Sequence, residues 1–225
     1  MFEGNILIVA AHPDDEVLGM GGTIHKLTTL GKDVSVLFIS DGVTSRAEVR
    51  ESIASRRESA KRALGILGCS KVTFSDFPDN KLDTVPMLDL CQRIENSVKQ
   101  LQPTTIFTHF PHDLNIDHQR VSEATNVAAR PSVSSSIDEL IYFEVLSSTN
   151  WKFGTQQFEP NLYLEVEENF EFKLLALSEY ATELNAYPNA RSIEAIQSLA
   201  IYRGATVGNK KSEAFEIGFI RQRFF

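Results

Sequence analysis

The chain has 225 residues, of which 42% are hydrophobic and 23% are charged, as is typical of a soluble globular protein. Its formal net charge of −8 argues against nucleic acid and against anionic membrane surfaces as partners, because both attract basic faces. No apolar run approaches the roughly 20 residues that span a bilayer, and the first residues lack the pattern of a signal peptide.

We therefore expect one domain, residues 1–225, without a transmembrane segment and located in the cytoplasm. The two cysteines, Cys69 and Cys91, do not have the spacing of a metal pair and are expected to be reduced, buried thiols. Assembly into a homo-oligomer is left open.

Strand-like and helix-like segments alternate along the chain. The first is an unbroken apolar run rich in β-branched residues, which predicts a strand buried on both faces. Strands are predicted over residues 5–11, 34–39, 71–74, 104–108, 141–145, 162–166 and 213–217, the sixth of them at an edge. Helices are predicted over residues 16–30, 47–67, 85–101, 117–129, 169–184 and 191–203. Gly31 and Gly204 are expected to end the first and last of these helices. The alternation predicts an α/β fold with a mostly parallel sheet.

The first predicted strand ends in a cluster of one imidazole and three carboxylates, His12, Asp14, Asp15 and Glu16. Ligands of open α/β sheets bind just outside the carboxyl ends of the strands, so the cluster lies where such a fold places its chemistry. A mixed histidine and carboxylate set suits zinc, iron or manganese, and a cation relieves the repulsion between adjacent carboxylates. The alternative is that Asp14 or Asp15 caps the helix that follows.

Three other features have two interpretations each. The glycines at positions 19, 21 and 22 indicate a close approach to a ligand or a neighbouring element, and their spacing disfavours a nucleotide-dependent Rossmann enzyme. Asp41 ends the second strand and either lines the same pocket or forms an Asp-Gly turn. Trp151 lies among polar residues and is either a lid or sugar-binding wall, or a packed loop aromatic.

Two blocks of the sequence carry a family resemblance. Residues 11–16 read Ala-His-Pro-Asp-Asp-Glu and are followed by Gly-Met-Gly-Gly-Thr at 19–23, and residues 108–118 place a histidine after an aspartate. Together they resemble the signature of the PIG-L / LmbE-like family, zinc-dependent N-deacetylases that act mostly on N-acetylglucosamine-type sugars. Weaker similarity over residues 77–83 and 203–215 extends the resemblance to nearly the whole chain. It implies a Rossmann-like three-layer sandwich with a mostly parallel central sheet.

The resemblance also implies roles for individual residues. The metal would be held by His12, Asp15 and His118, which leaves a coordination position open for water. Asp14 would be the general base, and Asp117 would orient a neighbouring group.

Assignments on the substrate side are less direct. The family carries an arginine that reaches the substrate, and Arg57 is the best match, with Arg56 as the rival because the register is uncertain by one residue. One branch of the family uses a histidine to stabilise the oxyanion or act as the acid, at the position of Asn115 in this chain. Asparagine can donate a hydrogen bond to an oxyanion but cannot transfer a proton at pH 7, so the acid would be Asp14 after protonation or His112.

The function that we expect from the resemblance is hydrolysis of the acetamide of an amino-sugar conjugate, giving acetate and a free amine. The expected cofactor is Zn2+, with other divalent ions such as Fe2+ as alternatives. The expected partner is the small-molecule conjugate itself. The second hypothesis is a catalytically weak or inactive metal- or sugar-binding protein of the same fold, which Asn115 favours and Asp14 disfavours.

Overall fold

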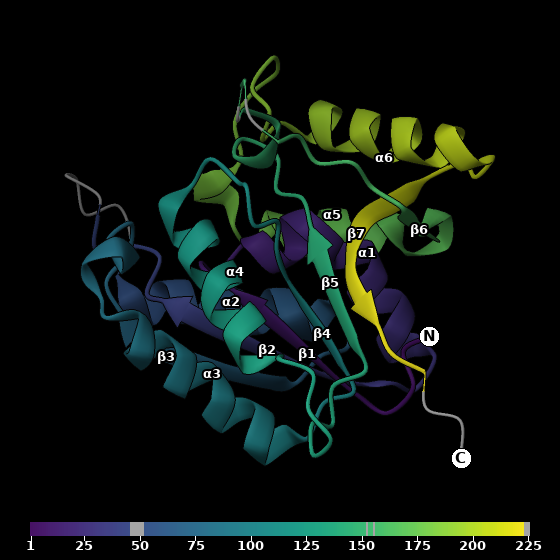
Figure 1. Ribbon diagram of the computed structural model, residues 1–225. Helices are drawn as coiled ribbons and strands as arrows, with labels where there is room; N and C mark the ends of the chain where they lie inside the picture. Colours follow the sequence, from purple (N-terminus) through teal and green to yellow (C-terminus); the bar gives the residue numbers. More distant parts are fainter. Residues whose placement is uncertain (46–51, 152, 155, 223–225) are drawn as a thin grey trace.

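The computed structural model describes residues 1–45, 52–151, 153–154 and 156–222. Its centre is a seven-stranded sheet with the strand order β3-β2-β1-β4-β5-β7-β6 (Figure 1). The strands are β1 (Asn5–Ala10), β2 (Asp33–Ser40), β3 (Lys71–Phe77), β4 (Thr105–His109), β5 (Glu139–Phe143), β6 (Leu162–Glu165) and β7 (Ser212–Ile220). The first five strands are parallel, whereas β7 runs antiparallel to both β5 and β6.

Helices cover both faces of the sheet. They are α1 (Asp15–Thr29), α2 (Ile53–Ile66), α3 (Met87–Leu101), α4 (Ile116–Ala128), α5 (Phe170–Ser178) and α6 (Ile193–Val207). Alternate residues of β1 enter two separate cores: Ile6 and Ile8 join the core that contains apolar side chains of α1, α2 and α5, and Leu7 and Val9 join the core of α3 and α4. The expected three-layer α/β fold is therefore confirmed, and its continuous apolar strands follow from burial on both faces.

The ends of two helices differ from the prediction. The predicted helix 169–184 stops as α5 at Ser178, and the chain continues in a short 3-10 turn, η4 (Ala181–Glu183). The predicted helix 191–203 does not end at Gly204 but runs on to Val207 and ends at Gly208, whose φ is 81°. Gly204 instead allows the backbone of Asn209 to pack closely against α6, because a Cβ at position 204 would lie 2.8 Å from the carbonyl oxygen of Asn209.

Other helix boundaries agree more closely. The predicted helix 47–67 is α2, which starts after the N-cap Ser52, and residues 46–51 lie outside the described part of the chain. Gly31 follows α1 with a φ of 76°, as expected for a helix C-terminus. The α1 glycines meet neighbouring elements, since a Cβ on Gly19 would lie 2.5 Å from the Phe143 ring.

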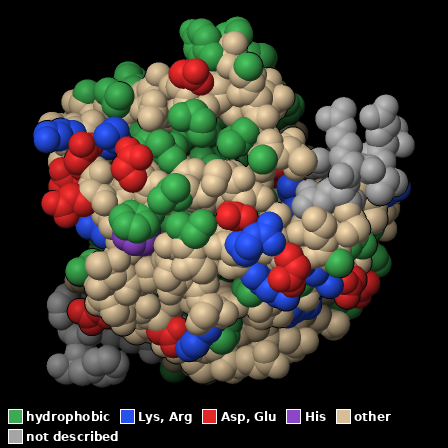
Figure 2. Space-filling model, turned by 180° about the vertical axis from the view of Figure 1, so that it is seen from behind, with side chains coloured by type: hydrophobic (Ala, Val, Ile, Leu, Met, Phe, Trp, Pro, Cys, Tyr) green, Lys and Arg blue, Asp and Glu red, His purple; other side chains and the backbone are tan. Residues whose placement is uncertain are grey.

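The outer surface is mixed. Seen from behind, hydrophobic side chains are interspersed with acidic and basic ones (Figure 2), and the exposed apolar residues of α5 and α6 include Phe172, Leu175, Ile201 and Tyr202. Scattered apolar residues are normal on a protein surface, so the homo-oligomer stays a prediction. None of the helices within the described residues has the length and apolar character that a bilayer crossing requires.

Candidate active site

The predicted metal ligands converge at the carboxyl edge of the sheet. His12 follows β1, Asp15 begins α1, and His118 lies in the first turn of α4, directly after the loop that leaves β4. The carboxylate atom Asp15 Oδ2 lies 3.2 Å from His12 Nδ1 and 3.3 Å from His118 Nε2. All three residues are buried, and one ligand atom from each lies within 4.8 Å of the others, so the fold brings them together as a set that could hold a metal ion.

Each histidine of this set has its second ring nitrogen against a buried carboxylate. His12 Nε2 lies 3.0 Å from Asp117 Oδ2 and 3.1 Å from Asp79 Oδ1. His118 Nδ1 lies 3.2 Å from Asp113 Oδ1, and the hydroxyls of Ser148 and Thr149 donate to that carboxylate. Carboxylates in such positions fix the tautomer and the ring orientation of a metal-binding histidine. With these nitrogens held by carboxylates, the other ring nitrogens, His12 Nδ1 and His118 Nε2, face Asp15 and can offer their lone pairs to a metal ion.

The donor set fits a divalent cation. His118 Nε2 and Asp15 Oδ1 are buried and make no hydrogen bond to any described residue, which is a costly state for polar atoms unless a ligand satisfies them. A second grouping, His12 with Asp79 and Asp117, has the same residue types. Both oxygens of Asp117, however, already accept backbone N–H groups, from Asn80 at 2.7 Å and from Leu82 at 2.9 Å. The first set is therefore the better metal site.

Electrostatics at the histidines supports the same interpretation. Burial disfavours the charged imidazole of His118, but Asp15 and Asp113 outweigh it and raise its pKa to about 9. Burial likewise opposes ionisation of Asp113, and His118 with the hydroxyl donors nevertheless lowers the pKa of Asp113 to about 2. The site thus holds cationic charge strongly, and a metal ion would replace the proton on His118.

Asp14 stands apart from the metal set and faces a pocket. It occupies the N-cap position of α1 with its carbonyl, but its side chain makes no capping hydrogen bond. Instead, Asp14 Oδ2 accepts from Arg191 Nη1 at 2.9 Å and lies 3.5 Å from Arg56 Nη2. Burial raises the pKa of Asp14, while the two guanidinium groups oppose that shift. The side chain therefore does not act as the helix cap that the sequence left open.

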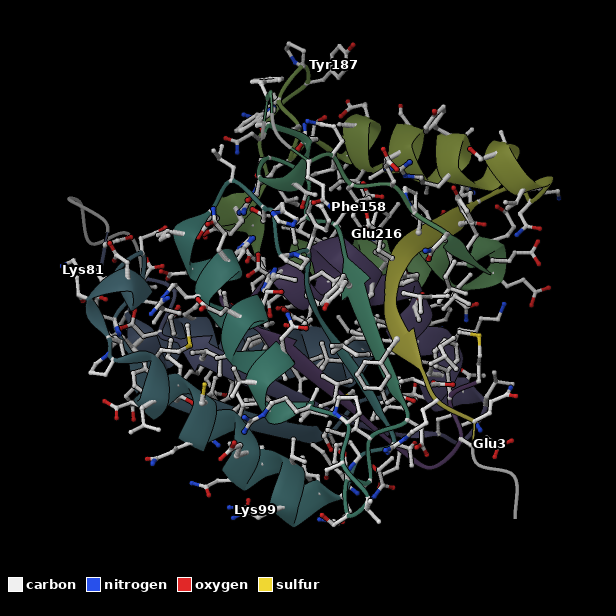
Figure 3. All side chains as sticks on the ribbon, viewed as in Figure 1. Glu3, Lys81, Lys99, Phe158, Tyr187 and Glu216 are labelled. Atoms are coloured by element: carbon white, nitrogen blue, oxygen red, sulfur yellow. The ribbon has the colours of Figure 1, made fainter. Side chains whose placement is uncertain are left out.

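The pocket beside Asp14 has a volume of about 200 Å³. Its lining residues are His12, Asp14, Gly42, Arg56, Asp79, Asn80, Asn115, Glu183 and Arg191. Arg191 comes from the loop between η4 and α6, whose outer end carries Tyr187 (Figure 3). That loop is joined to the loop after β5 because Arg191 Nε donates to Ser147 Oγ at 2.6 Å. Loops distant in sequence thus close one side of the pocket.

Asn115 divides its side chain between two tasks. Its Oδ1 accepts from the backbone N–H of Asp117 at 2.8 Å and of His118 at 3.4 Å, which makes Asn115 the N-cap of α4. Its Nδ2 donates to Asn80 Oδ1 at 3.3 Å on the pocket side. The amide nitrogen therefore faces another residue of the pocket lining, whereas the oxygen faces the start of α4.

The residues proposed for the substrate side are placed unevenly. Arg57 lies outside the pocket, where its guanidinium contacts Asp76 and donates to Ser75 O at 3.1 Å. Its rival Arg56 is only 1% exposed and lines the pocket, so the geometry favours the rival register. Asp41 accepts from the N–H groups of Val43 and Thr44, as the turn interpretation expects.

Two further aromatic or imidazole side chains lie away from the pocket lining. His112 is exposed and packs edge-to-face on Phe110, with 5.6 Å between ring centroids. Trp151 ends a short 3-10 turn, η2 (Thr149–Trp151), and is 41% exposed, so it is not a fully packed loop aromatic.

Sequence reasoning missed several residues around the site. Asp113 was within the second block, and its place five residues before His118 was a usable signal. Glu183 ends the short 3-10 turn η4, Arg191 lies in the loop that follows it, and neither had a signal in the sequence. His109 was not missed, because it was expected to pack beneath the site, and there its Nε2 accepts from the backbone N–H of Ala11 at 2.8 Å. Burial and the neighbouring His118 lower the pKa of His109. The Ala11 amide already occupies the lone pair of His109 Nε2, so this nitrogen is not available to a metal ion.

Comparisons with known proteins indicate the family and the fold of this chain. The sequence model of PIG-L, described as GlcNAc-PI de-N-acetylase, matches residues 7–129. The diacetylchitobiose deacetylase of Thermococcus kodakarensis is 27% identical over 92% of this chain and 80% of its own length. A conserved protein of Thermus thermophilus has the same fold, with a TM-score of 0.80 at 20% identity over 98% of this chain and 97% of its own.

The fold alone does not fix the reaction. The 4-carboxy-2-hydroxymuconate hydratase from Pseudomonas putida also matches, with a TM-score of 0.74 at 22% identity over 99% of each chain. The family match is more specific, because it covers more than half of the chain and contains Asp14 and the three residues that could hold a metal ion. The resemblance seen in the two sequence blocks is confirmed: this chain belongs to the PIG-L family.

Proposed function

We propose that this protein is a metal-dependent hydrolase that removes the acetyl group from an N-acetylated amino-sugar conjugate. The observation that carries the proposal is the buried set of His12, Asp15 and His118 beside a pocket into which Asp14 faces. Zinc is the cofactor that we propose, because two imidazoles and one carboxylate with an open position form a common catalytic zinc set, and Fe2+ is the alternative.

A cation held by this set would supply Lewis acidity to the acetyl carbonyl and lower the pKa of the attacking water. Asp14 takes a proton from that water as the water oxygen bonds to the carbonyl carbon. The carbonyl oxygen thereby becomes an oxyanion. The amide hydrogens of Asn115 donate to the oxyanion. The C–N bond then breaks, and Asp14 returns the proton to the nitrogen, which gives a free amine and acetic acid, and the acid ionises to acetate by releasing the remaining proton of the water. Asp14 suits both proton transfers better than His112, which lies outside the pocket lining.

The carboxylates behind the histidines have a supporting role. Asp117 holds His12 through Nε2, and Asp113 holds His118 through Nδ1. Both are buried, so they keep the ring orientations fixed while the substrate enters and the product leaves. Arg56 is the proposed contact for the sugar, since its guanidinium lines the pocket next to Asp14.

The decisive experiment measures acetate release from a panel of N-acetyl sugars: free N-acetylglucosamine, diacetylchitobiose, and N-acetylglucosamine joined to a phosphate, an organic acid or a lipid. Protein stripped of metal and reloaded with Zn2+ or Fe2+ tests the cofactor. Asp14→Asn should keep the metal and the fold yet lose about 10²–10⁴-fold in turnover, as expected for loss of a general base.

Two results would contradict the proposal. Retention of full metal occupancy in His118→Ala would remove the ligand assignment. Sugar and metal binding without acetate release from any member of the panel would support the second hypothesis, a binding protein of the same fold, for which Asn115 is the motivating residue.

A further inference from the structure

The backbone of Asp14 adopts an unusual conformation. Its φ is 135° and its ψ is −29°, a region that residues with a side chain rarely adopt. The next residue, Asp15, belongs to the metal set, and Asp14 itself lines the pocket. Such conformations persist only where surrounding contacts hold them, and they are concentrated at functional sites.

One buried side chain holds this conformation directly. Glu16 Oε2 accepts from the backbone N–H of Asp14 at 3.0 Å, although the two residues are only two apart in the chain. Its other oxygen, Oε1, accepts from the hydroxyl of Tyr180 at 2.7 Å. Glu16 is fully buried, and it belongs neither to the metal set nor to the pocket lining. Both oxygens of Glu16 therefore accept hydrogen bonds, one from the backbone of Asp14 and one from Tyr180.

Tyr180 fixes the position of Glu16 from a distant part of the chain. It follows α5 and is almost fully buried. The guanidinium of Arg56 lies over its ring, with 5.4 Å between Arg56 Cζ and the ring centroid. Tyr180 lies beyond the segment that the family model matches, residues 7–129, whereas Glu16 lies within it. The hydrogen-bonded series therefore runs from the end of α5 through Glu16 to the backbone of Asp14.

We propose that Glu16 and Tyr180 are positioning residues that hold the backbone of Asp14 so that its carboxylate faces the pocket. Neither touches substrate or metal; both act through Asp14. The inference rests on the proposed function only in the role of Asp14 as the base. The simpler alternative is that Glu16 does no more than stabilise the first turn of α1, as acidic residues at helix N-termini commonly do.

The two explanations differ in what they predict for turnover. A helix-stabilising carboxylate contributes to folding alone, so its loss would lower the unfolding temperature and leave kcat unchanged in folded protein. A positioning residue affects kcat, because misplacement of a catalytic group by about 1 Å can cost about 10²-fold. KM should stay nearly constant, since Glu16 does not line the pocket.

Four variants separate these outcomes. Glu16→Ala removes the contact and should lower kcat about 10²-fold with unchanged KM and unchanged metal content. Glu16→Gln should retain kcat within about tenfold, because its amide oxygen can accept from Asp14 while its amide nitrogen donates to Tyr180. Tyr180→Phe should give an intermediate loss. Tyr142→Phe is the matched control. The Tyr142 hydroxyl donates to Asn126 Oδ1 at 2.6 Å, and neither residue lines the pocket.

A structural measurement keeps the inference testable if no panel substrate is turned over. Hydrogen exchange of the Asp14 amide, followed by NMR in metal-loaded protein, should accelerate in Glu16→Ala and stay slow in Glu16→Gln. Parental kcat in folded Glu16→Ala, or a loss in Glu16→Gln as large as in Glu16→Ala, would overturn the inference. So would unchanged exchange of the Asp14 amide in Glu16→Ala, whether or not acetate is released.

Discussion

Arg191 Nη1 lies 2.9 Å from Asp14 Oδ2, an ion pair that links the loop before α6 to the carboxyl end of β1. Burial raises the pKa of Asp14, and the guanidinium of Arg191 is the first of the groups that oppose it. The pair therefore favours the ionised form of the proposed base and opposes the effect of burial.

Replacement of Arg191 by Met should shift the acidic limb of the kcat/KM profile to higher pH. The sign follows because the cation favours the ionised carboxylate, so its removal raises the pKa of Asp14 and less of the base is available at low pH. Arg191→Lys should restore most of the activity at neutral pH. Profiles of kcat/KM against pH for the parent and both variants test this, and an unmoved acidic limb in Arg191→Met would refute it.

The neighbouring arginines of α2 provide a matched comparison. Arg56→Met removes a buried guanidinium that lines the pocket, whereas Arg57→Met removes one that contacts Asp76 outside it. We expect Arg56→Met to raise KM for the sugar at least tenfold and Arg57→Met to leave KM within about twofold of the parent. The reverse order would restore the register in which Arg57 matches the family arginine.

Asp113→Ala should weaken metal binding by about 10–100-fold, the usual effect of removing a carboxylate that orients a metal-binding histidine. His118 Nδ1 would lose its acceptor, and the ring could turn its Nε2 away from Asp15. Competition with a chelator of known affinity measures the dissociation constant. Asp138→Ala, at the surface pair with Arg221, is the control and should bind metal as the parent does. Equal affinity of Asp113→Ala and the control would remove Asp113 from the metal site.

The sequence predicted the parts of the site that local pattern determines. Each of the two sequence blocks that resemble the family follows a buried parallel strand, and the carboxyl ends of parallel strands meet at one edge of the sheet. His12 and His118 were therefore predictable from strand position together with residue type. Asp113 could have been added, because it lies in the same block as His118.

The missed residues depend on tertiary packing. Arg191 and Tyr180 come from the irregular chain around η4, and no periodicity places those loops over the first strand. The misplaced end of α6 has a similar cause, since Gly204 is required by the close approach of Asn209 and not by helix termination. Asn115 was recognised from the motif, but its use of Oδ1 as an N-cap follows from the observed turn.

Lys173 and Glu213 form a buried ion pair that supports a kink in α1. Lys173 Nζ lies 2.6 Å from Glu213 Oε1 and donates to Leu18 O at 2.8 Å. Glu213 also accepts from the N–H groups of Gly22 and Thr23, on the far side of Met20, whose φ is −150° and ψ 27°. The pair thus satisfies backbone groups that the kink frees from the helix.

Lys173→Met should lower the free energy of unfolding by about 3–5 kcal/mol, because it leaves the Glu213 carboxylate buried without its partner. Urea unfolding followed by circular dichroism measures this. Lys71→Met breaks the exposed pair with Asp33 and, as the control, should cost no more than about 1 kcal/mol. An equal loss of unfolding free energy in the two variants would mean that the buried Lys173 pair stabilises the fold no more than the exposed Lys71 pair does.

Asn115 needs variants that separate its two tasks. Asn115→Ala removes the N-cap of α4 together with the amide donors, so loss of the cap alone should cost about 1 kcal/mol of stability. Asn115→Asp keeps an oxygen that accepts from Asp117 N–H, but it has no amide hydrogens to donate. The aspartate variant therefore tests the donors with the helix start intact.

If the amide hydrogens stabilise the oxyanion, both Asn115→Ala and Asn115→Asp should lose about 10²–10³-fold in kcat, although only the alanine variant loses the cap. Asn115→His should recover part of the activity that the alanine and aspartate variants lose. Its pH profile should also contain an added ionisation near the imidazole reference value of about 6.5. His112→Ala should leave the basic limb of the pH profile unchanged, because that side chain is exposed and does not line the pocket. Profiles of kcat and kcat/KM against pH for these four variants, each with its metal content measured, decide the role. Parental kcat in Asn115→Asp would show that the donors contribute nothing to turnover, and Asn115 would then be a helix cap alone.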